Sequence, residues 1–491
     1  MRNRLYNGDN LAVLREGEIP PGSVDLVYLD PPFKSGQKYN QIFRGPSGRK
    51  SAAQRQAFKD TWEWGPEAMN AFHDTLDTAP IDVRIALQSL RSIVGETSLL
   101  AYLSMMAPRL VELERVLVDG GSLYLHCDPT ASHYLKVLLD AVFGPNGFQN
   151  EVIWSYRRWP SPSNHYQRMH DCLLFYAKGK KGPKTFNVEY EPTSDSYQKR
   201  FGGKTQRLDP ETKSRKITSE EESKGMPLRD VWSISIIAGF SKERTGWPTQ
   251  KPARLLERII SVSSNEGDVV MDPFCGCGTA VDVAEKLKRR WIGIDIARHA
   301  TDVIEDRLQK THGPGVKATY EFIPKPVTAE DARKLKDAPF LFQWWALEKV
   351  GAQPAPKRKG PDKGVDGRLY FREHVGADAI DAKQVVISVK AGQTGPHHVR
   401  ELRGVVEREG AAIGVLITLR KPTKAMLSEA AESEPYYSST WDRRYQRLQV
   451  ITVEDLMTPA PIDYPAKLPP APTVQESVPK FEPLRHVHVR S

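Results

Sequence analysis

The feature that most constrains this chain is the tetrapeptide Asp30-Pro31-Pro32-Phe33, which directly follows an apolar run at residues 24–29. The run predicts a buried strand. The two prolines fix φ and remove two backbone donors, so a stiff turn follows the strand. In open α/β sheets, ligands bind at the carboxyl ends of the strands. A carboxylate, a proline carbonyl and an aromatic ring at that edge suit a planar amino group, which donates to the first two and stacks on the third.

The glycine loop at residues 272–280 decides how the tetrapeptide is interpreted, because Pro-Pro after a strand is commonly only a turn. Gly276 and Gly278 let the backbone approach a ligand that a Cβ would exclude. Thr279 opens a predicted helix, whose first amides can hold a carboxylate. Asp295 ends the next predicted strand, and an acid roughly 20 positions after a glycine loop suits ribose hydroxyls. The loop lacks the Gly-x-Gly-x-x-Gly pattern of dinucleotide sites.

In this order, the two stretches resemble the amino-group DNA methyltransferases that use S-adenosylmethionine, in the circular arrangement called the β class. The resemblance covers about three-fifths of the chain. It implies an α/β fold over residues 1–312, with a Rossmann-like methyltransferase sheet. In this family the tetrapeptide, here Asp30, Pro31, Pro32 and Phe33, is catalytic. The residues that match the family's cofactor-binding positions are Asp9, Thr249, Gln250, Lys251, Asp272, Phe274, Gly276, Gly278, Thr279 and Asp295.

The reaction that this resemblance implies is transfer of a methyl group from S-adenosylmethionine to the exocyclic amine of a base in double-stranded DNA. The base would be flipped out of the stack to reach Asp30. There the carboxylate and the Pro31 carbonyl would orient the amine while Phe33 stacks on the ring. In the family, Asp at the first position of the tetrapeptide favours adenine N6 and Ser favours cytosine N4, so adenine is expected and cytosine is the alternative. An RNA or protein-glutamine substrate, or a DNA-binding protein with a decayed pocket, also stays open.

Other segments of the first domain have a functional and a structural interpretation. Asp9 precedes a predicted helix and is either its cap or, as in the family, a neighbour of the cofactor. Residues 34–96 form either a segment that closes over the flipped base or a helical insertion. Residues 179–246 interleave basic and aromatic residues where β-class enzymes carry their target-recognition region, although a disordered basic loop is the alternative. His126, at the end of a predicted strand, is either structural or substrate-positioning.

Composition restricts the class of protein. A net charge of +9 and a pI near 9.1 favour a polyanionic partner. No apolar run approaches the roughly 20 residues of a membrane helix, and the N-terminus lacks a signal peptide's apolar core, which predicts a cytoplasmic protein with no membrane partner. The four cysteines lack zinc spacing, so no metal site is predicted from them. A homodimer and a cognate restriction endonuclease are further partners that a restriction–modification setting would supply.

A second, smaller α/β domain is predicted over residues 335–460, after a linker at 313–334 and before a proline-rich tail at 461–491. Its pattern of helix, two strands, helix and strand carries Asp366 before one strand and Lys390 at the end of the next. This arrangement resembles the Mrr-like branch of the PD-(D/E)xK restriction nucleases.

Nuclease chemistry of that kind needs carboxylates to hold a divalent metal and a lysine beside the attacking water. Asp366 and Lys390 match two of those roles, but Ser388 stands where the second acid belongs. A hydroxyl is a poor Mg²⁺ ligand, so Mg²⁺ is expected only if this domain cleaves DNA. Both a fused methylase–nuclease and a degenerate binding domain therefore stay open.

Overall fold

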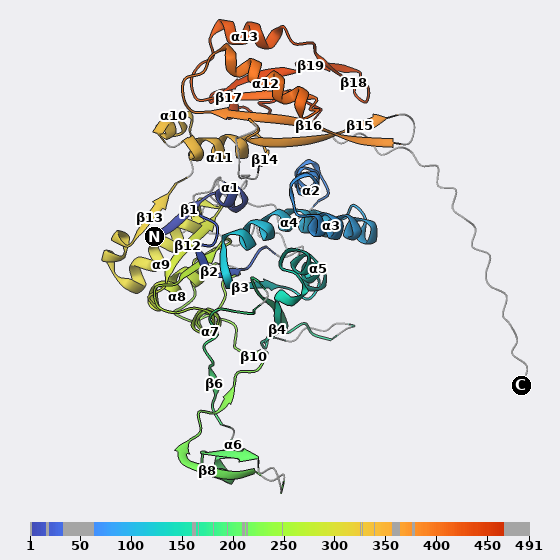
Figure 1. Cartoon of the computed structure of the whole chain (residues 1–491). Helices are drawn as coiled ribbons and strands as arrows, with labels where there is room; N and C mark the ends of the chain where they lie inside the picture. Colours follow the sequence, from blue (N-terminus) through green and yellow to red (C-terminus); the bar gives the residue numbers. More distant parts are fainter. Residues whose placement is uncertain are drawn as a thin grey trace, which may run out of the picture.

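The computed structural model contains two α/β units in one chain (Figure 1). The residues that the structure describes are 2–15, 19–32, 63–159, 164, 166–179, 181–193, 195–208, 212, 215–247, 249–324, 326, 328–337, 339–355, 364–375 and 379–465. Phe33, residues 34–62 of the predicted excursion and the tail from residue 466 lie outside them.

The larger unit is built on a nine-stranded sheet in the order β10-β4-β5-β3-β2-β11-β12-β1-β13. The strands from β3 to β13 in this order are parallel, whereas β5 runs antiparallel to β3 and β4. This confirms the predicted α/β fold class. The strands are β1 (Asn3–Asn7), β2 (Val24–Leu29), β3 (Leu117–Cys127), β4 (Phe148–Ser155), β5 (His170–Ala177), β10 (Val231–Ser233), β11 (Val269–Asp272), β12 (Arg290–Asp295) and β13 (Tyr320–Ile323).

Strand β11 lies between β2 and β12, although most of the domain's sequence separates it from β2. Met271 pairs with Val27 on one side and with Ile292 on the other. Since all three strands are parallel, their carboxyl ends meet at one edge of the sheet. The acids predicted at those strand ends are therefore neighbours in space.

Helices cover both faces of this sheet, because alternate residues of its strands are apolar on both sides. Val27 and Leu29 pack into the core under one set of helices, whereas Leu26 and Tyr28 pack into the core under the other. The first set is α1 (Asn10–Arg15), α2 (Pro66–Thr78), α3 (Ile81–Val94), α4 (Ser98–Val116) and α5 (Ser132–Phe143). The second set is α7 (Ala253–Ser263), α8 (Thr279–Lys286) and α9 (Arg298–His312).

Helices α2, α3 and α4 lie against one another on the first face of the sheet. Helix α4 ends at Val116, because Leu117 already pairs with Val24 as part of β3. The described part of the 34–96 segment holds α2 and α3, which pack against α4 and α5. Helical insertion is thus the correct interpretation of residues 66–94.

A narrow arm projects from the sheet at the edge formed by β4 and β10 (Figure 1). It falls within the basic segment predicted at 179–246. Two antiparallel pairs form it, with a short helix between them. Its elements are β6 (Tyr190–Glu191), α6 (Asp195–Phe201), β7 (Lys204–Leu208), β8 (Arg215–Glu222) and β9 (Met226–Pro227).

The smaller unit has a five-stranded sheet in the order β14-β15-β16-β17-β20. Helix α11 packs on one face of the sheet, and α12 and α13 pack on the other. The strands are β14 (Gln353–Pro354), β15 (Gly367–Val375), β16 (Ala379–Lys390), β17 (Ile413–Thr418) and β20 (Leu448–Thr452), with a separate pair β18 (Tyr436–Ser438) and β19 (Arg443–Tyr445). The helices are α10 (Ala329–Lys334), α11 (Pro339–Lys349), α12 (Pro396–Arg408) and α13 (Lys424–Ala431).

The segment predicted as a linker, residues 313–334, has structure of its own. Strand β13 within it pairs in parallel with β1 and extends the larger sheet. Helix α10 follows and begins with a capping box between Thr328 and Asp331. The start of the predicted tail is also packed, because Ile462 is buried in the core of the smaller unit.

Candidate functional site

Asp30 stands in the turn after β2, at the sheet edge where the strand ends meet. Its side chain is 16% exposed, and its Oδ2 forms an ion pair with Nζ of Lys251, which is 11% exposed. Pro31 is buried next to it, and Phe33 lies outside the described residues. The carboxylate that the tetrapeptide predicts therefore points at a cation rather than into open solvent.

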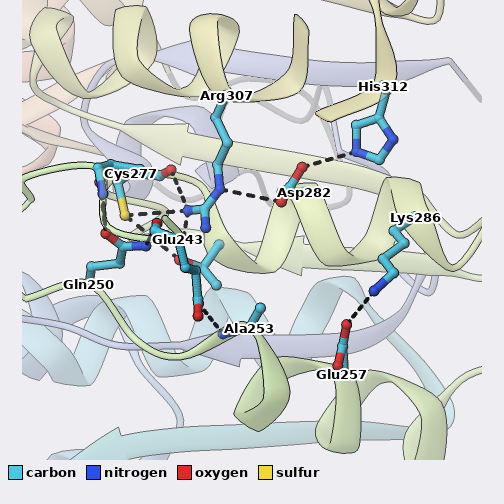
Figure 2. A network of polar contacts seen from close by, with 11 residues as sticks. Glu243, Gln250, Ala253, Glu257, Cys277, Asp282, Lys286, Arg307 and His312 are labelled. Atoms are coloured by element: carbon cyan, nitrogen blue, oxygen red, sulfur yellow. Dashed lines mark hydrogen bonds and ion pairs between the residues drawn. The ribbon is translucent and has the colours of Figure 1, made fainter. Parts of the chain in front are cut away.

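Lys251 matches a cofactor-binding position of the family, but the structure places it on Asp30. The segment before α7 is fixed by Gln250, which accepts hydrogen bonds from N and Oγ1 of Thr245, both at 2.8 Å. The Gln250 amide donates to the Glu243 carbonyl at 2.8 Å, and the Glu243 carboxylate caps α7 by accepting from Ala253 N at 2.7 Å (Figure 2). These bonds hold the chain so that Lys251 reaches Asp30. Thr249 is exposed.

The glycine loop after β11 adopts the backbone that its sequence predicts. Gly276 and Gly278 have φ values of +50° and +72°, a backbone conformation that residues with a Cβ rarely adopt. Thr279 begins α8, as predicted, and no side chain caps that helix. The tight turn of the glycine loop leads directly into the start of α8, whose first backbone amides have no side-chain cap. These amides can therefore bind an anionic group.

Arg307, on α9, stabilises the glycine loop through hydrogen bonds. Its Nη1 donates to the Cys277 carbonyl at 3.1 Å and to Thr279 Oγ1 at 2.9 Å, while its Nε pairs with Asp282 at 3.3 Å (Figure 2). His312 bonds the same aspartate at 3.0 Å. Sequence reasoning missed this support because Arg307 is one of many basic residues on an amphipathic helix.

Two further carboxylates complete the edge. Asp272 is buried and accepts from Phe274 N at 3.1 Å. Burial raises the pKa of Asp272 well above its usual range, and the nearby charges of Asp30 and Asp295 raise it further. Asp295 accepts from Gly276 N and Ala297 N, both at 2.8 Å, and burial raises its pKa to about 6. Asp295 therefore bridges the glycine loop and the next turn.

Asp9 caps α1 by accepting from Ala12 N at 3.1 Å, as one of its two interpretations predicted. Its other oxygen accepts from Arg109 Nη2 at 2.6 Å. The neighbouring Asn10 donates to the Pro273 carbonyl at 2.7 Å. The turn before α1 is thereby bonded directly to the glycine loop.

With this geometry established, comparison with known proteins identifies the family. The protein-family model described as DNA methylase matches residues 24–306, more than half of the chain. The chain belongs to this DNA methylase family. Both predicted landmarks of the methylase domain, the tetrapeptide and the glycine loop, fall inside the match.

Individual relatives resemble the methylase domain. The chain is 27% identical over 311 residues to the type II methyltransferase M.BamHI of Bacillus amyloliquefaciens, covering 62% of this chain and 57% of that protein. It is 31% identical over 207 residues to M.HpaI of Haemophilus parainfluenzae, covering 42% and 59%. It is 24% identical over 293 residues to the DNA adenine methyltransferase YhdJ of Escherichia coli K12, covering 60% and 78%. The chain thus spans less than two-thirds of the length of M.BamHI and M.HpaI.

Solved structures align with the same part of the chain. The M1.HpyAVI–SAM complex aligns at 18% identity and a TM-score of 0.34, covering 62% of this chain and 99% of that chain. The cytosine-N4-specific PvuII DNA methyltransferase aligns at 16% identity and a TM-score of 0.35, covering 66% and 95%.

In the methylase domain, a buried polar network lies next to Asp30 that sequence reasoning did not find. His126 bonds Tyr28 OH at 2.9 Å and Asp171 at 3.2 Å, and Tyr156 OH donates to the same aspartate at 3.0 Å. Burial lowers the pKa of His126, which favours the neutral ring. Although burial alone would raise it, the bonds from His126 and Tyr156 keep the pKa of Asp171 below its usual range. Tyr28, two residues before Asp30, is fixed by this network.

The smaller unit matches a different family model, described as NACHT-associated inactive Restriction Endonuclease 1, over residues 338–458. The Mrr-like assignment is not supported by this match, nor is a role for Mg²⁺. Asp366 is buried and accepts from Val389 N at 2.6 Å and from Ser388 Oγ at 3.3 Å. Among the described residues, no group of three or more His, Cys, Asp or Glu side chains could hold a metal ion. The smaller unit thus resembles a restriction endonuclease family that the family model describes as inactive.

The described helices include none that is both long and apolar enough to cross a membrane.

Proposed function

We propose that this chain transfers the methyl group of S-adenosylmethionine to an exocyclic amine of a base in double-stranded DNA, with adenine N6 as the target. The observation that carries the proposal is the shared edge of β2, β11 and β12, where Asp30, the glycine loop and Asp295 stand side by side. Membership of the DNA methylase family supports the same reaction class. The choice of adenine rests on Asp, rather than Ser, at position 30.

The residues at this edge suit the cofactor. Gly276 and Gly278 keep side chains away from the loop backbone, and the uncapped start of α8 suits the methionine carboxylate. Asp295 is placed for ribose hydroxyls, because an ionised carboxylate accepts more hydrogen bonds than its two amide donors use. When bound, S-adenosylmethionine supplies an electrophilic methyl group on its sulfonium centre.

The base amine would meet Asp30. One oxygen of the carboxylate already accepts from Lys251, which leaves the other for the amine, and the Pro31 carbonyl can accept the second amine hydrogen. These two acceptors orient the nitrogen lone pair toward the methyl group, so the rate gain comes mainly from proximity and orientation. Once the nitrogen has gained a methyl group, its surplus proton can pass to the Asp30 carboxylate.

The projecting arm is the proposed target-recognition region. Its exposed basic residues, including Lys199 and Arg200 at the end of α6, suit phosphate contacts. Tyr197 and Phe201 pack together beside them at 5.3 Å between ring centroids. Localisation in the cytoplasm, a homodimer and a cognate restriction endonuclease stay predictions.

The test is expression of the wild type and Asp30→Ala in cells that lack DNA methylases, followed by mass spectrometry of digested genomic DNA. N6-methyladenine that appears with the wild type and is absent with Asp30→Ala is the expected result. N4-methylcytosine would keep the reaction class and overturn the choice of base. No modified base with the wild type would contradict the proposal.

A further inference from the structure

The smaller unit reaches into the core of the methylase domain through one side chain, Trp344 on α11. Trp344 is 1% exposed and belongs to the apolar cluster that includes Tyr6, Leu14 and Leu29 of the larger unit. The next residue, Trp345, faces the opposite way into the core of the smaller unit and donates its Nε1 hydrogen to the Pro326 carbonyl at 2.9 Å. Trp344 therefore lies in the core of the larger unit, whereas the adjacent Trp345 lies in the core of the smaller unit.

Trp344 packs directly on Gly8. A Cβ built on Gly8 would lie 1.5 Å from Cζ2 of the indole and 2.1 Å from Cη2. Both distances are far shorter than a van der Waals contact between carbon atoms. The indole therefore occupies the space that any other residue at position 8 would fill.

The turn that Trp344 covers is the one that connects the strand ends of the cofactor edge. Gly8 N donates to the Asp295 carbonyl at 2.8 Å, and the Asn7 amide donates to the same carbonyl at 3.1 Å. Two residues further on, Asn10 donates to the Pro273 carbonyl at the start of the glycine loop. A single short turn thus touches the backbone of both acidic strand ends, and Trp344 supports it from outside the domain.

A second set of contacts fixes how the two units dock. Arg15, at the end of α1, is buried, pairs with Asp74 at 2.8 Å and donates to the Pro354 carbonyl of β14. Tyr370 on β15 donates its backbone N–H to Asn70 Oδ1 and its hydroxyl to Asp77, both at 2.6 Å. Strand β15 lies along α2 in Figure 1. These polar contacts leave Trp344 little freedom to withdraw from Gly8.

We propose that Trp344 is a positioning residue of the cofactor site, through which the endonuclease-like domain holds the Gly8–Asn10 turn against the glycine loop. The domain carries Ser388 where metal chemistry of the nuclease kind would need a second acid, and its Trp344 completes the core of the methylase domain. That the ligand of this site is S-adenosylmethionine rests on the proposed function. The support that Trp344 gives to the turn rests on packing alone.

The experiment compares full-length Trp344→Ala with Trp345→Ala, its neighbour in the other core, and with Trp344→Phe. Binding of S-adenosylmethionine is measured by calorimetry well below the melting temperature, and hydrogen exchange is followed over residues 3–15 and 269–280. Trp344→Ala should weaken binding by about tenfold or more and speed exchange in both segments. Trp345→Ala should lower the melting temperature and leave the affinity within about twofold. Trp344→Phe should weaken binding less than Trp344→Ala does, because the smaller ring fills part of the space but lacks the outer indole atoms that lie against Gly8.

A double-mutant comparison tests the contact itself. Gly8→Ala should weaken binding in the wild type, because its methyl group collides with the indole, and should have a much smaller effect in Trp344→Ala. Equal effects in both backgrounds, or unchanged affinity and exchange in Trp344→Ala, would overturn the inference. A wild type that binds no S-adenosylmethionine would contradict the proposed function instead, while the exchange data would still test the support.

Discussion

At the edge of the larger sheet, the carboxylate of Asp30 meets the ammonium group of Lys251, which comes from 221 residues downstream. In the smaller sheet, Asp366 accepts from the backbone of Val389 and from Ser388, both on the neighbouring strand β16. Lys251 occupies one oxygen of Asp30, whereas the Val389 N–H and the Ser388 hydroxyl both bond one oxygen of Asp366. The comparison teaches that two acids near strand ends can have different roles: a side chain from a distant segment fixes Asp30, whereas Asp366 is bonded to a strand of its own sheet.

The largest expected difference between the two regions is in the rate of methylation. Asp30→Asn should lower the rate at least about 100-fold, because the amine loses its charged acceptor. Asp366→Asn should leave the rate within about twofold and lower stability by about 1 kcal/mol, since the Val389 N–H then bonds a neutral amide oxygen instead of a charged carboxylate. Single-turnover methylation and urea unfolding of both variants measure this. Equal losses of rate would remove the distinction between the two acids.

A smaller difference in methylation rate is expected between variants of Lys251 and of Lys390. Lys251→Met should slow methylation by about tenfold, because the Asp30 carboxylate loses the cation that holds it in place. Lys390→Met in the smaller sheet is the matched control and should have no effect on the rate. Methylation assays on the purified variants provide the check, and a Lys251→Met enzyme as fast as the wild type would show that the ion pair has no role in turnover.

The acidic edge also predicts a pH dependence of stability. Burial raises the pKa of Asp295 to about 6, whereas an unfolded chain has an aspartate pKa of about 3.9. The folded state therefore binds the proton more tightly, and the contribution of Asp295 to stability falls as pH rises from about 4 to about 6.

Asp295→Asn should flatten that decline, although the variant loses one amide contact at every pH. Urea unfolding at several pH values, with Asp366→Asn as the control, measures the slope. A slope that is the same in Asp295→Asn and the wild type would reassign the titration to another group.

The smallest expected effect is that of metal removal. Since Asp366 is bonded within its own sheet and Ser388 replaces the second acid, EDTA should change neither the methylation rate nor the melting temperature, and Mg²⁺ should not produce DNA cleavage. Cleavage of unmethylated DNA that requires Mg²⁺ and is lost in Lys390→Met would contradict this expectation.

Local pattern was sufficient to predict much of the fold. Thr279 begins α8 as predicted, because the glycines before it take positive φ values and turn the chain out of the strand. The resemblance to a family supplied the roles of Asp30 and Asp295. Their proximity depends on the insertion of β11 between β2 and β12, which no local pattern contains.

Contacts between distant segments could not be predicted in the same way. Lys251 matched a cofactor motif, but its ion pair depends on how Gln250 and Glu243 fold the chain before α7. The contact between Gly8 and Trp344 could not be predicted, because the indole belongs to another domain. Glycines and prolines predicted a linker over residues 313–334, whereas β13 within it forms a strand by pairing with β1.

The tryptophan that fills the space above Gly8 also has a consequence for inheritance. A recombination event between the two coding halves would give the methylase a foreign helix in place of α11 and leave an empty hole over its first turn. The recombined protein would fold stably only if its new C-terminal half had an aromatic side chain of similar size at the position of Trp344. Gly8 and Trp344 should therefore be inherited together, and a chain without this C-terminal half has room for a larger side chain at position 8.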